Sequence, residues 1–226
     1  MRQSNRLFVS MLAVAMMATA LPALAGSPKG VCQSGGVNSR VLAEAQRRYF
    51  EWSLGASDQQ EVGRLFFVPL PAGESNGGDP EIFIGKESFA VRTGKTLVLP
   101  MSVYIGESYL DSLDPPVPDD PVDYPEREFF TDSMVLLTVD GRAIVDSERT
   151  KLDCVYFDAV FFTAPIEYSV PTDYGADAAL WVKGLGILLP PLHPGVHVIR
   201  LKVLTPWNFG YDNTWRVTVV PPKKGG

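Results

Sequence analysis

Both histidines of the chain lie close together, and imidazole is the side chain used most often for metal binding and proton transfer near neutral pH. His193 and His197 flank the dipeptide Pro194-Gly195. A metal site built on this pair would need carboxylates to complete it, because the chain has no third histidine. The alternation of His197 with Ile199 and Leu201 instead favours a half-buried histidine that hydrogen-bonds across a sheet. This stretch is therefore better evidence for a strand than for a metal centre.

Carboxylates concentrate between residues 107 and 132, in a segment that also carries several prolines. Calcium prefers several hard oxygen ligands, and Asp119, Asp120 and Asp123 are the residues we assign to such a site. The segment lacks the Asp-x-Asp-x-Asp-Gly spacing of a dedicated calcium loop, and interleaved prolines are typical of extended chain. Apart from this calcium ion, the sequence predicts no cofactor.

The same acidic segment offers a second hypothesis, an envelope hydrolase of the glycosidase type. Such an enzyme needs two carboxyl groups about 5 to 10 Å apart on opposite sides of a sugar.

Aromatic residues gather close to the C-terminus. Trp207, Phe209 and Tyr211 alternate with small and polar residues, and rings on a loop can stack on sugars or anchor a protein partner. We therefore predict that these three residues form a ligand-binding tip. The alternative is that the nearby Trp215 belongs to the core and that Tyr211 packs over the end of a hairpin.

The N-terminus predicts export. Arg2 and Arg6 precede the apolar segment 7–21, and Ala23-Leu24-Ala25 offers a cleavage site after Ala25. The apolar segment is shorter than the roughly 20 residues that cross a bilayer, so we expect a signal peptide rather than a membrane anchor. The mature protein is therefore expected to be periplasmic or secreted, with no membrane attachment.

Two cysteines remain after this cleavage. In an oxidising compartment Cys32 and Cys154 are expected to pair, and the alternative is two free thiols with Cys154 as a buried apolar filler. No Cys-x-x-Cys is present to suggest a zinc site. The formal charge of the whole chain is −6, and an acidic protein repels nucleic acid and anionic lipid.

The elements that would position these residues are mainly strands. Residues 38–54 carry apolar residues at helical spacing after a capping Asn38, and Gly55 follows as a stop. From residue 64 onward, short apolar runs alternate with Pro, Gly, Asp and Asn, without intervening helices. The expected strands are 64–70, 81–84, 87–92, 95–105, 134–139, 142–145, 153–162, 178–189, 196–204 and 214–220.

This pattern predicts an all-β fold, an antiparallel β-sandwich of the immunoglobulin-like or jelly-roll-like kind with one N-terminal helix. The expected organisation is a signal peptide over 1–25, a leader and helix over 26–60, the sandwich over 61–220 and a disordered tail over 221–226. The basic side chains of the helix leave open a contact with a membrane surface.

Four segments resemble a group of secreted bacterial β-rich proteins of unknown function. Residues 89–100 are similar to that group's Pro-Ala-Gly-Lys-Ala-Leu-Phe-Phe-Pro segment, residues 138–141 to its Thr-Val-Asp-Gly turn, and residues 188–199 to its Leu-Leu-Pro-Pro-Leu-Ser-Pro-Gly-x-His-Thr-Ile segment. Residues 49–52 match an earlier Trp-containing segment. The chain departs from the group in having Phe89 where the group has Cys. The resemblance implies export and a β-rich domain and adds no chemistry.

Together these observations predict an exported, non-catalytic β-sandwich that binds a ligand or a protein partner in the cell envelope or outside the cell. The envelope hydrolase is the alternative. A structural component of a surface assembly is a third class, which an unpaired edge strand or a broad apolar patch would reveal.

Overall fold

The computed structural model describes residues 38–221. The predicted signal peptide, Cys32 and all but the first residue of the predicted tail lie outside these residues. Within 38–221, no helix is both long enough and apolar enough to cross a membrane.

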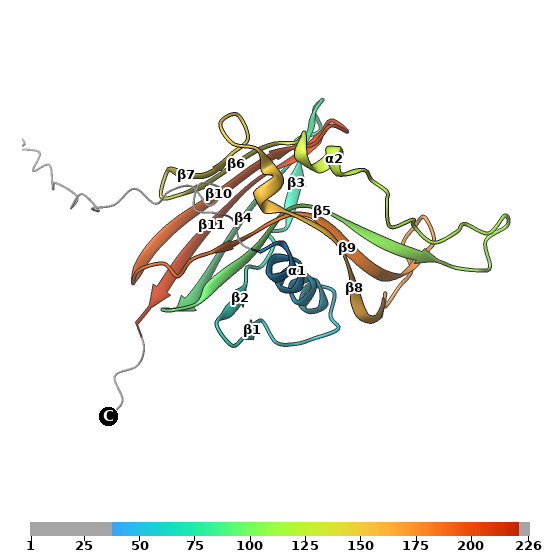
Figure 1. The fold of residues 1–226 in the computed structure, drawn as a ribbon, viewed down its shortest axis with the longest axis horizontal. Helices are drawn as coiled ribbons and strands as arrows, with labels where there is room; N and C mark the ends of the chain where they lie inside the picture. Colours follow the sequence, from blue (N-terminus) through green and yellow to red (C-terminus); the bar gives the residue numbers. More distant parts are fainter. Residues whose placement is uncertain (1–37, 222–226) are drawn as a thin grey trace, which may run out of the picture.

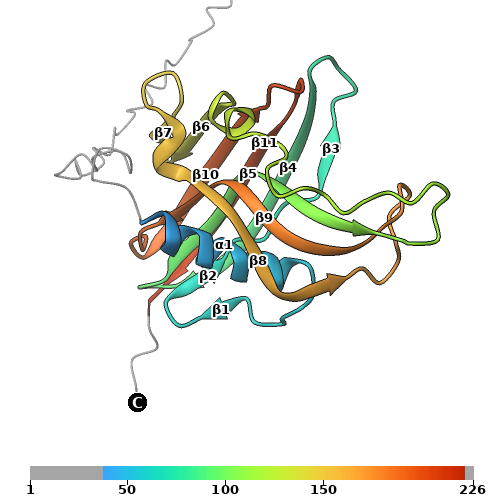
Figure 2. The ribbon, with the colours of Figure 1, turned by 45° about the vertical axis from the view of Figure 1, so that its right-hand side comes forward.

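Two β-sheets pack face to face, and one helix lies against the outer face of one of them (Figures 1 and 2). The helix is α1 (Ser39–Ser53). The five-stranded sheet contains, in spatial order, β1 (Glu61–Val62), β2 (Leu65–Phe67), β5 (Thr96–Tyr109), β9 (Ala176–Leu189) and β8 (Tyr156–Glu167). The six-stranded sheet contains β3 (Gly73–Ser75), β4 (Glu81–Arg92), β11 (Phe209–Val220), β10 (Gly195–Leu204), β6 (Met134–Val139) and β7 (Arg142–Asp146). The predicted all-β sandwich is confirmed.

Two pairs of neighbouring strands run parallel, so the expectation of a wholly antiparallel sandwich is wrong. β4 pairs with β11 in parallel along its whole length, and β2 pairs with β5 in parallel over three positions. Periodicity shows which face of a strand is buried but not which way its neighbour runs. The chain between β4 and β11 builds strands of both sheets, which provides the long connection that a parallel pair requires.

Short elements interrupt the predicted pattern. The predicted runs 81–84 and 87–92 form the single strand β4. The acidic segment ends in a short helix, α2 (Arg127–Thr131), and a 3₁₀ turn, η1 (Leu152–Val155), precedes β8. These turns and the edge strands β1 and β3 are too short to give a periodic signal.

The core between the sheets is built from alternating residues, as the sequence predicts. In β11, Trp215, Val217 and Val219 are buried, while Arg216 and Thr218 are exposed. The Trp215 indole also donates a hydrogen bond of 2.7 Å to the carbonyl of Pro69, a residue between β2 and β3. Trp215 therefore belongs to the core, as the alternative interpretation held.

The apolar face of α1 packs on the five-stranded sheet. Asn38 caps the helix by accepting a hydrogen bond of 2.9 Å from the Arg40 amide. Leu42, Tyr49 and Phe50 are buried against residues of β2, β5, β8 and β9. The helix is therefore part of the packed domain, and its apolar face is not available to a membrane.

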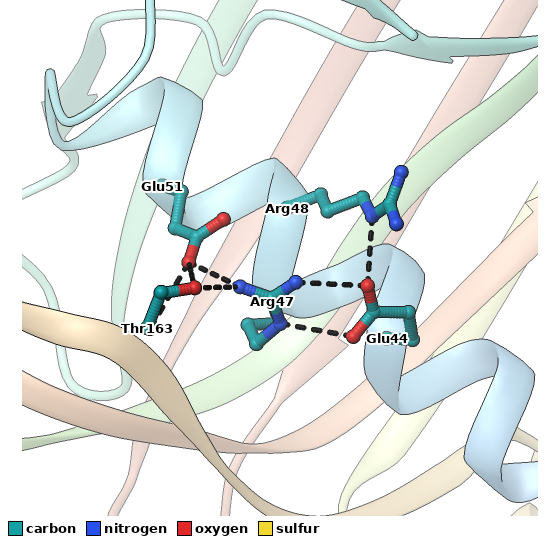
Figure 3. Close-up of polar contacts among 5 residues, drawn as sticks. All are labelled: Glu44, Arg47, Arg48, Glu51 and Thr163. Carbon is teal, nitrogen blue, oxygen red and sulfur yellow. Dashed lines mark hydrogen bonds and ion pairs between the residues drawn. The ribbon is translucent and has the colours of Figure 1, made fainter. Parts of the chain in front are cut away.

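The polar face of α1 is joined to β8 by a network of charges (Figure 3). Arg47 bonds to Glu44, at 2.8 and 2.9 Å, and to Glu51, whose carboxylate also accepts from the Thr163 amide and hydroxyl. Arg48 donates to Glu44 at 2.8 Å. The bond from Arg47, assisted by Arg48, lowers the pKa of Glu44 to about 2 despite the opposing effect of burial. Of the three arginines that left a membrane contact open, Arg40, Arg47 and Arg48, the last two are thus paired within the protein.

His197 is held between two hydrogen-bond acceptors. Its Nδ1 lies 2.7 Å from a carboxylate oxygen of Asp140, and its Nε2 lies 2.8 Å from the carbonyl oxygen of His193. Because neither partner donates, this arrangement favours the doubly protonated, cationic imidazole. Burial lowers the pKa of His197, but these two bonds outweigh it and raise the pKa above its usual value. The prediction of a half-buried histidine that bonds across the sheet is confirmed, and neither nitrogen is free to bind a metal.

The His197 bonds predict a stability that depends on pH. A raised folded-state pKa means that the stabilisation is fully present below the unfolded value, near 6.5, and is lost as the pH rises through the folded value. We expect His197→Gln to cost on the order of 1 kcal/mol at pH 5.5 and clearly less at pH 9, as measured by urea unfolding. His193→Gln is the matched control, because its side chain is exposed and only its backbone carbonyl is used. An equal loss at both pH values would contradict a cationic His197.

Candidate functional site

The three aromatic residues of the predicted tip lie in different environments. Trp207, in the turn between β10 and β11, is 48% exposed. The Phe209 ring lies 6.4 Å from that of Trp207, and the Tyr211 ring lies 6.1 Å beyond Phe209. Phe209 and Tyr211 are half-buried, and burial raises the pKa of the Tyr211 hydroxyl. Of the three, only Trp207 is exposed, while Tyr211 packs near the hairpin end.

Trp207 meets two aromatic residues of the acidic segment. Its ring lies 6.0 Å from that of Tyr124, with 28° between the planes, and 4.2 Å from that of Phe129 in α2. Tyr124 is 47% exposed. In Figure 1, α2 accordingly lies beside the tip of the β10–β11 hairpin.

These contacts enclose a shallow groove of about 390 Å³, which we call the aromatic groove. Its lining combines ring surfaces, two prolines and three carboxylates. The lining residues are Tyr124, Pro125, Glu126, Glu128, Phe129, Asp132, Pro206 and Trp207. The groove thus joins the predicted aromatic tip to the predicted acidic loop.

Asp120 fixes the start of the loop segment that carries Tyr124. One of its carboxylate oxygens accepts from the Tyr104 hydroxyl at 3.2 Å and from the Glu107 amide at 3.0 Å. The other accepts from the Tyr109 hydroxyl at 3.2 Å. Burial and the charge of Asp120 raise the pKa of Tyr109 to about 12, so this phenol remains a donor.

Lys183 of β9 holds the next part of the loop. Its ammonium group donates a hydrogen bond of 2.7 Å to the carbonyl of Val122. Burial lowers the pKa of Lys183, against the opposing effect of the Asp123 and Asp158 charges. The Tyr124 ring then stands edge-on to that of Tyr104, with centroids 5.7 Å apart. Bonds from β5 and β9 therefore position the ring that stacks on Trp207.

The predicted calcium site is not formed. Asp119, Asp120 and Asp123 belong to no group of three or more His, Cys, Asp or Glu side chains placed to hold a metal, within residues 38–221. Asp119 and Asp123 are exposed, and both oxygens of Asp120 accept hydrogen bonds from the protein. The prediction was wrong because the presence of aspartates does not show whether their carboxylates are already hydrogen-bonded. Asp120 already accepts from the Tyr104 and Tyr109 hydroxyls.

A second carboxylate at the base of this loop is also held by tyrosines. Glu107 accepts from the Tyr168 hydroxyl at 2.6 Å and from the Tyr174 hydroxyl at 3.4 Å. Burial and the bond to Glu107 raise the pKa of Tyr168. Glu107 and Asp120 therefore act as acceptors that join loops to strands.

Sequence reasoning missed Tyr124 and Phe129 as parts of the site. The available signal was the presence of aromatic residues, including Phe130, in a segment otherwise made of Pro, Asp and Glu. Solvated linkers contain few aromatic residues, so these rings indicate a segment that packs against the protein. Phe130 is completely buried and so attaches α2 to the core.

Cys154 is half-buried at η1 and packs against the core between the sheets. Its predicted partner Cys32 lies outside the described residues, so this pairing stays a prediction.

No family model, no curated protein and no solved structure matches the chain. The resemblance to secreted bacterial β-rich proteins also stays a prediction.

The Asp120 bonds predict a local effect of its removal. Asp120→Ala deletes three hydrogen bonds to a carboxylate, so hydrogen exchange over residues 105–125 should accelerate by at least about tenfold, equivalent to roughly 1.4 kcal/mol of local stability. Mass-spectrometric hydrogen exchange measures this directly. Asp119→Ala is the control, because this neighbouring side chain is exposed and has no hydrogen-bond partner within the described residues. Equal exchange in the two variants would show that Asp120 does not hold the loop.

Proposed function

We propose that this protein is an exported, non-catalytic binding protein that holds a neutral carbohydrate in the aromatic groove. The observation that carries the proposal is the pair Trp207 and Tyr124, two contacting rings that each remain about half exposed. Large rings are normally buried when they serve only the core. Exposed ring faces next to hydrogen-bond acceptors suit a sugar, which has apolar C–H faces and hydroxyl edges.

The charges around the rings argue against an anionic ligand. Glu126, Glu128 and Asp132 line the groove, and no Lys, Arg or His does. The nearby Arg127 is directed elsewhere, because it pairs with Asp153 at 2.6 Å and lies over the Tyr156 ring at 4.5 Å. Carboxylates accept bonds from hydroxyl groups and repel anions. Acidic sugars, phosphates and nucleic acids are therefore poor candidates.

The same carboxylates favour binding over hydrolysis. A glycosidase prepares its general acid by taking one carboxyl group out of water. Glu126, Glu128 and Asp132 are all exposed. The half-buried carboxylates Glu107 and Asp120 are occupied by tyrosine hydroxyls outside the groove. No observation on the described residues specifically supports the hydrolase alternative.

The proposal also includes export of the protein and a disulfide bond between Cys32 and Cys154. The support is the signal-peptide pattern before Ala25 and the even number of cysteines after it. A bond from Cys32 to Cys154 would tie the N-terminal segment to η1, which packs close to α2 and β9.

Removal of either exposed ring should weaken binding. We expect Trp207→Ala and Tyr124→Ala each to reduce affinity by at least about tenfold for the best ligand among cellopentaose, maltopentaose and N-acetylchitopentaose, measured by titration calorimetry. Phe161→Ala is the matched control, because this ring on β8 is 58% exposed and does not line the groove. The proposal fails if none of these sugars binds, or if Phe161→Ala weakens binding as much as Trp207→Ala.

The mature protein should begin after Ala25 and contain no free thiol. Expression of the full chain in a bacterial host, followed by mass measurement of the exported protein, tests the cleavage site. Thiol titration in denaturant should find none without reductant and two after reduction, and reduction should lower stability by about 4 to 5 kcal/mol at most. In the Cys154→Ser control, Cys32 should become titratable. Two reactive thiols in the unreduced protein would exclude the bond.

A further inference from the structure

A second pocket, of about 210 Å³, lies between the two sheets. We call it the inter-sheet pocket. One wall comes from β5, and the opposite wall comes from β4, β10 and β11. The segment Leu70-Pro71, which joins β2 to β3, closes one side, and the half-exposed Leu70 stands at the rim. This pocket is separate from the aromatic groove, with which it shares no lining residue.

The walls of the inter-sheet pocket are mainly apolar and carry no charge. Phe83, Pro100, Met101 and Leu201 are among the apolar residues that line it. None of the lining residues is Asp, Glu, Lys, Arg or His. Charged ligands would lose their hydration here without a compensating partner. The pocket therefore suits a neutral molecule.

Asn213 and Pro71, which line the pocket, pack closely against the backbone of Gly85. A Cβ atom at Gly85 would lie 2.7 Å from Oδ1 of Asn213 and 2.7 Å from Cβ of Pro71. Such distances are far shorter than ordinary van der Waals contact. The absence of a side chain at Gly85 thus allows Asn213 and Pro71 to occupy their places beside the pocket.

Three polar side chains line the pocket without a hydrogen bond to the protein. Ser102 is 5% exposed, Asn213 is 7% exposed, and Tyr211 is half-buried. Among residues 38–221, no group accepts from or donates to the side chain of any of the three. Among the described residues, Gln46 Oε1 is the one fully buried side-chain polar atom without a partner, so the polar atoms of these three residues reach the open space of the pocket. Their convergence on one apolar pocket is the usual arrangement of a small-molecule site.

We infer that the inter-sheet pocket binds a small, neutral and largely apolar molecule with one polar group, which bonds to Asn213 and Tyr211. A cavity of 150 Å³ accepts benzene, so a pocket of about 210 Å³ suits roughly eight to ten non-hydrogen atoms. This is the size of one fused ring system or of a short branched chain. The amide of Asn213 can donate and accept, and the Tyr211 hydroxyl can do the same.

Indole and indene are a suitable pair of probes, because they match in size and shape and only indole carries an N–H group. We expect indole to bind the wild-type protein in calorimetric or NMR titration, at least fivefold more tightly than indene. Shifts of backbone resonances in β4, β5 and β11 would place the bound molecule. The inference is overturned if indole does not bind at millimolar concentration, or if it shifts only residues outside the pocket.

Two variants test the polar contacts. Asn213→Leu keeps the side-chain volume and Tyr211→Phe removes only a hydroxyl, so both should reduce the preference for indole over indene to less than twofold. Both variants should be at least as stable as the wild type in thermal unfolding, because each loses an unpaired polar group. If these groups have a purely structural role, the variants should lose stability and keep the preference for indole. That result would overturn the inference.

Trp207→Ala separates this site from the aromatic groove. Indole could also stack on the exposed Trp207 ring, but in the inter-sheet pocket its affinity should not depend on that residue. We expect Trp207→Ala to leave indole binding unchanged within twofold while it weakens sugar binding. Loss of indole binding in Trp207→Ala would overturn the assignment to the pocket and leave the proposed sugar site standing.

Discussion

Strand β9 is buried on both faces, and this constraint determines how the rest of the protein is arranged. From Ala176 to Leu189 nearly every residue is buried, without the alternation of a half-solvated strand. Such a strand must be covered on two sides. The six-stranded sheet covers one face, and α1 covers the other. The approach of α1 is close, since a Cβ atom at Gly186 would lie 2.3 Å from the Gln46 amide nitrogen.

The buried middle layer also provides the support for the aromatic groove. Trp181 is almost completely buried in β9 and lies 5.9 Å from the ring of Tyr104, which in turn contacts Tyr124. Lys183, two residues further along β9, bonds to the loop backbone. A loop rich in proline and aspartate has little cohesion of its own, because it buries few apolar groups. The loop is therefore held near the groove by its bonds to β5 and β9, and the positions of these two strands are fixed by the core.

The sequence could predict what depends on local pattern. Alternation placed Trp215, Val217 and Val219 in the core, and helical spacing with a capping Asn38 located α1 within a residue at each end. The sequence pattern could not predict contacts between residues that are far apart in the chain. The parallel pairing of β4 with β11 is one such feature, and the use of Asp120 by two tyrosine hydroxyls of β5 is another. The calcium hypothesis failed for that second reason.

The three residues of the predicted aromatic tip lie next to one another but in different surroundings. Trp207, Phe209 and Tyr211 do form a row of neighbouring rings, yet the row runs from solvent into the space between the sheets. Along β11, side chains alternate in direction, and the turn before it removes Trp207 from that alternation. Trp207, at one end of the row, therefore contacts Tyr124 in the aromatic groove. Tyr211, at the other end, lines the inter-sheet pocket together with Asn213. The groove depends on a loop held by Asp120 and Lys183, whereas the pocket is walled mainly by strands, so a change that loosens the loop acts on the first site and spares the second.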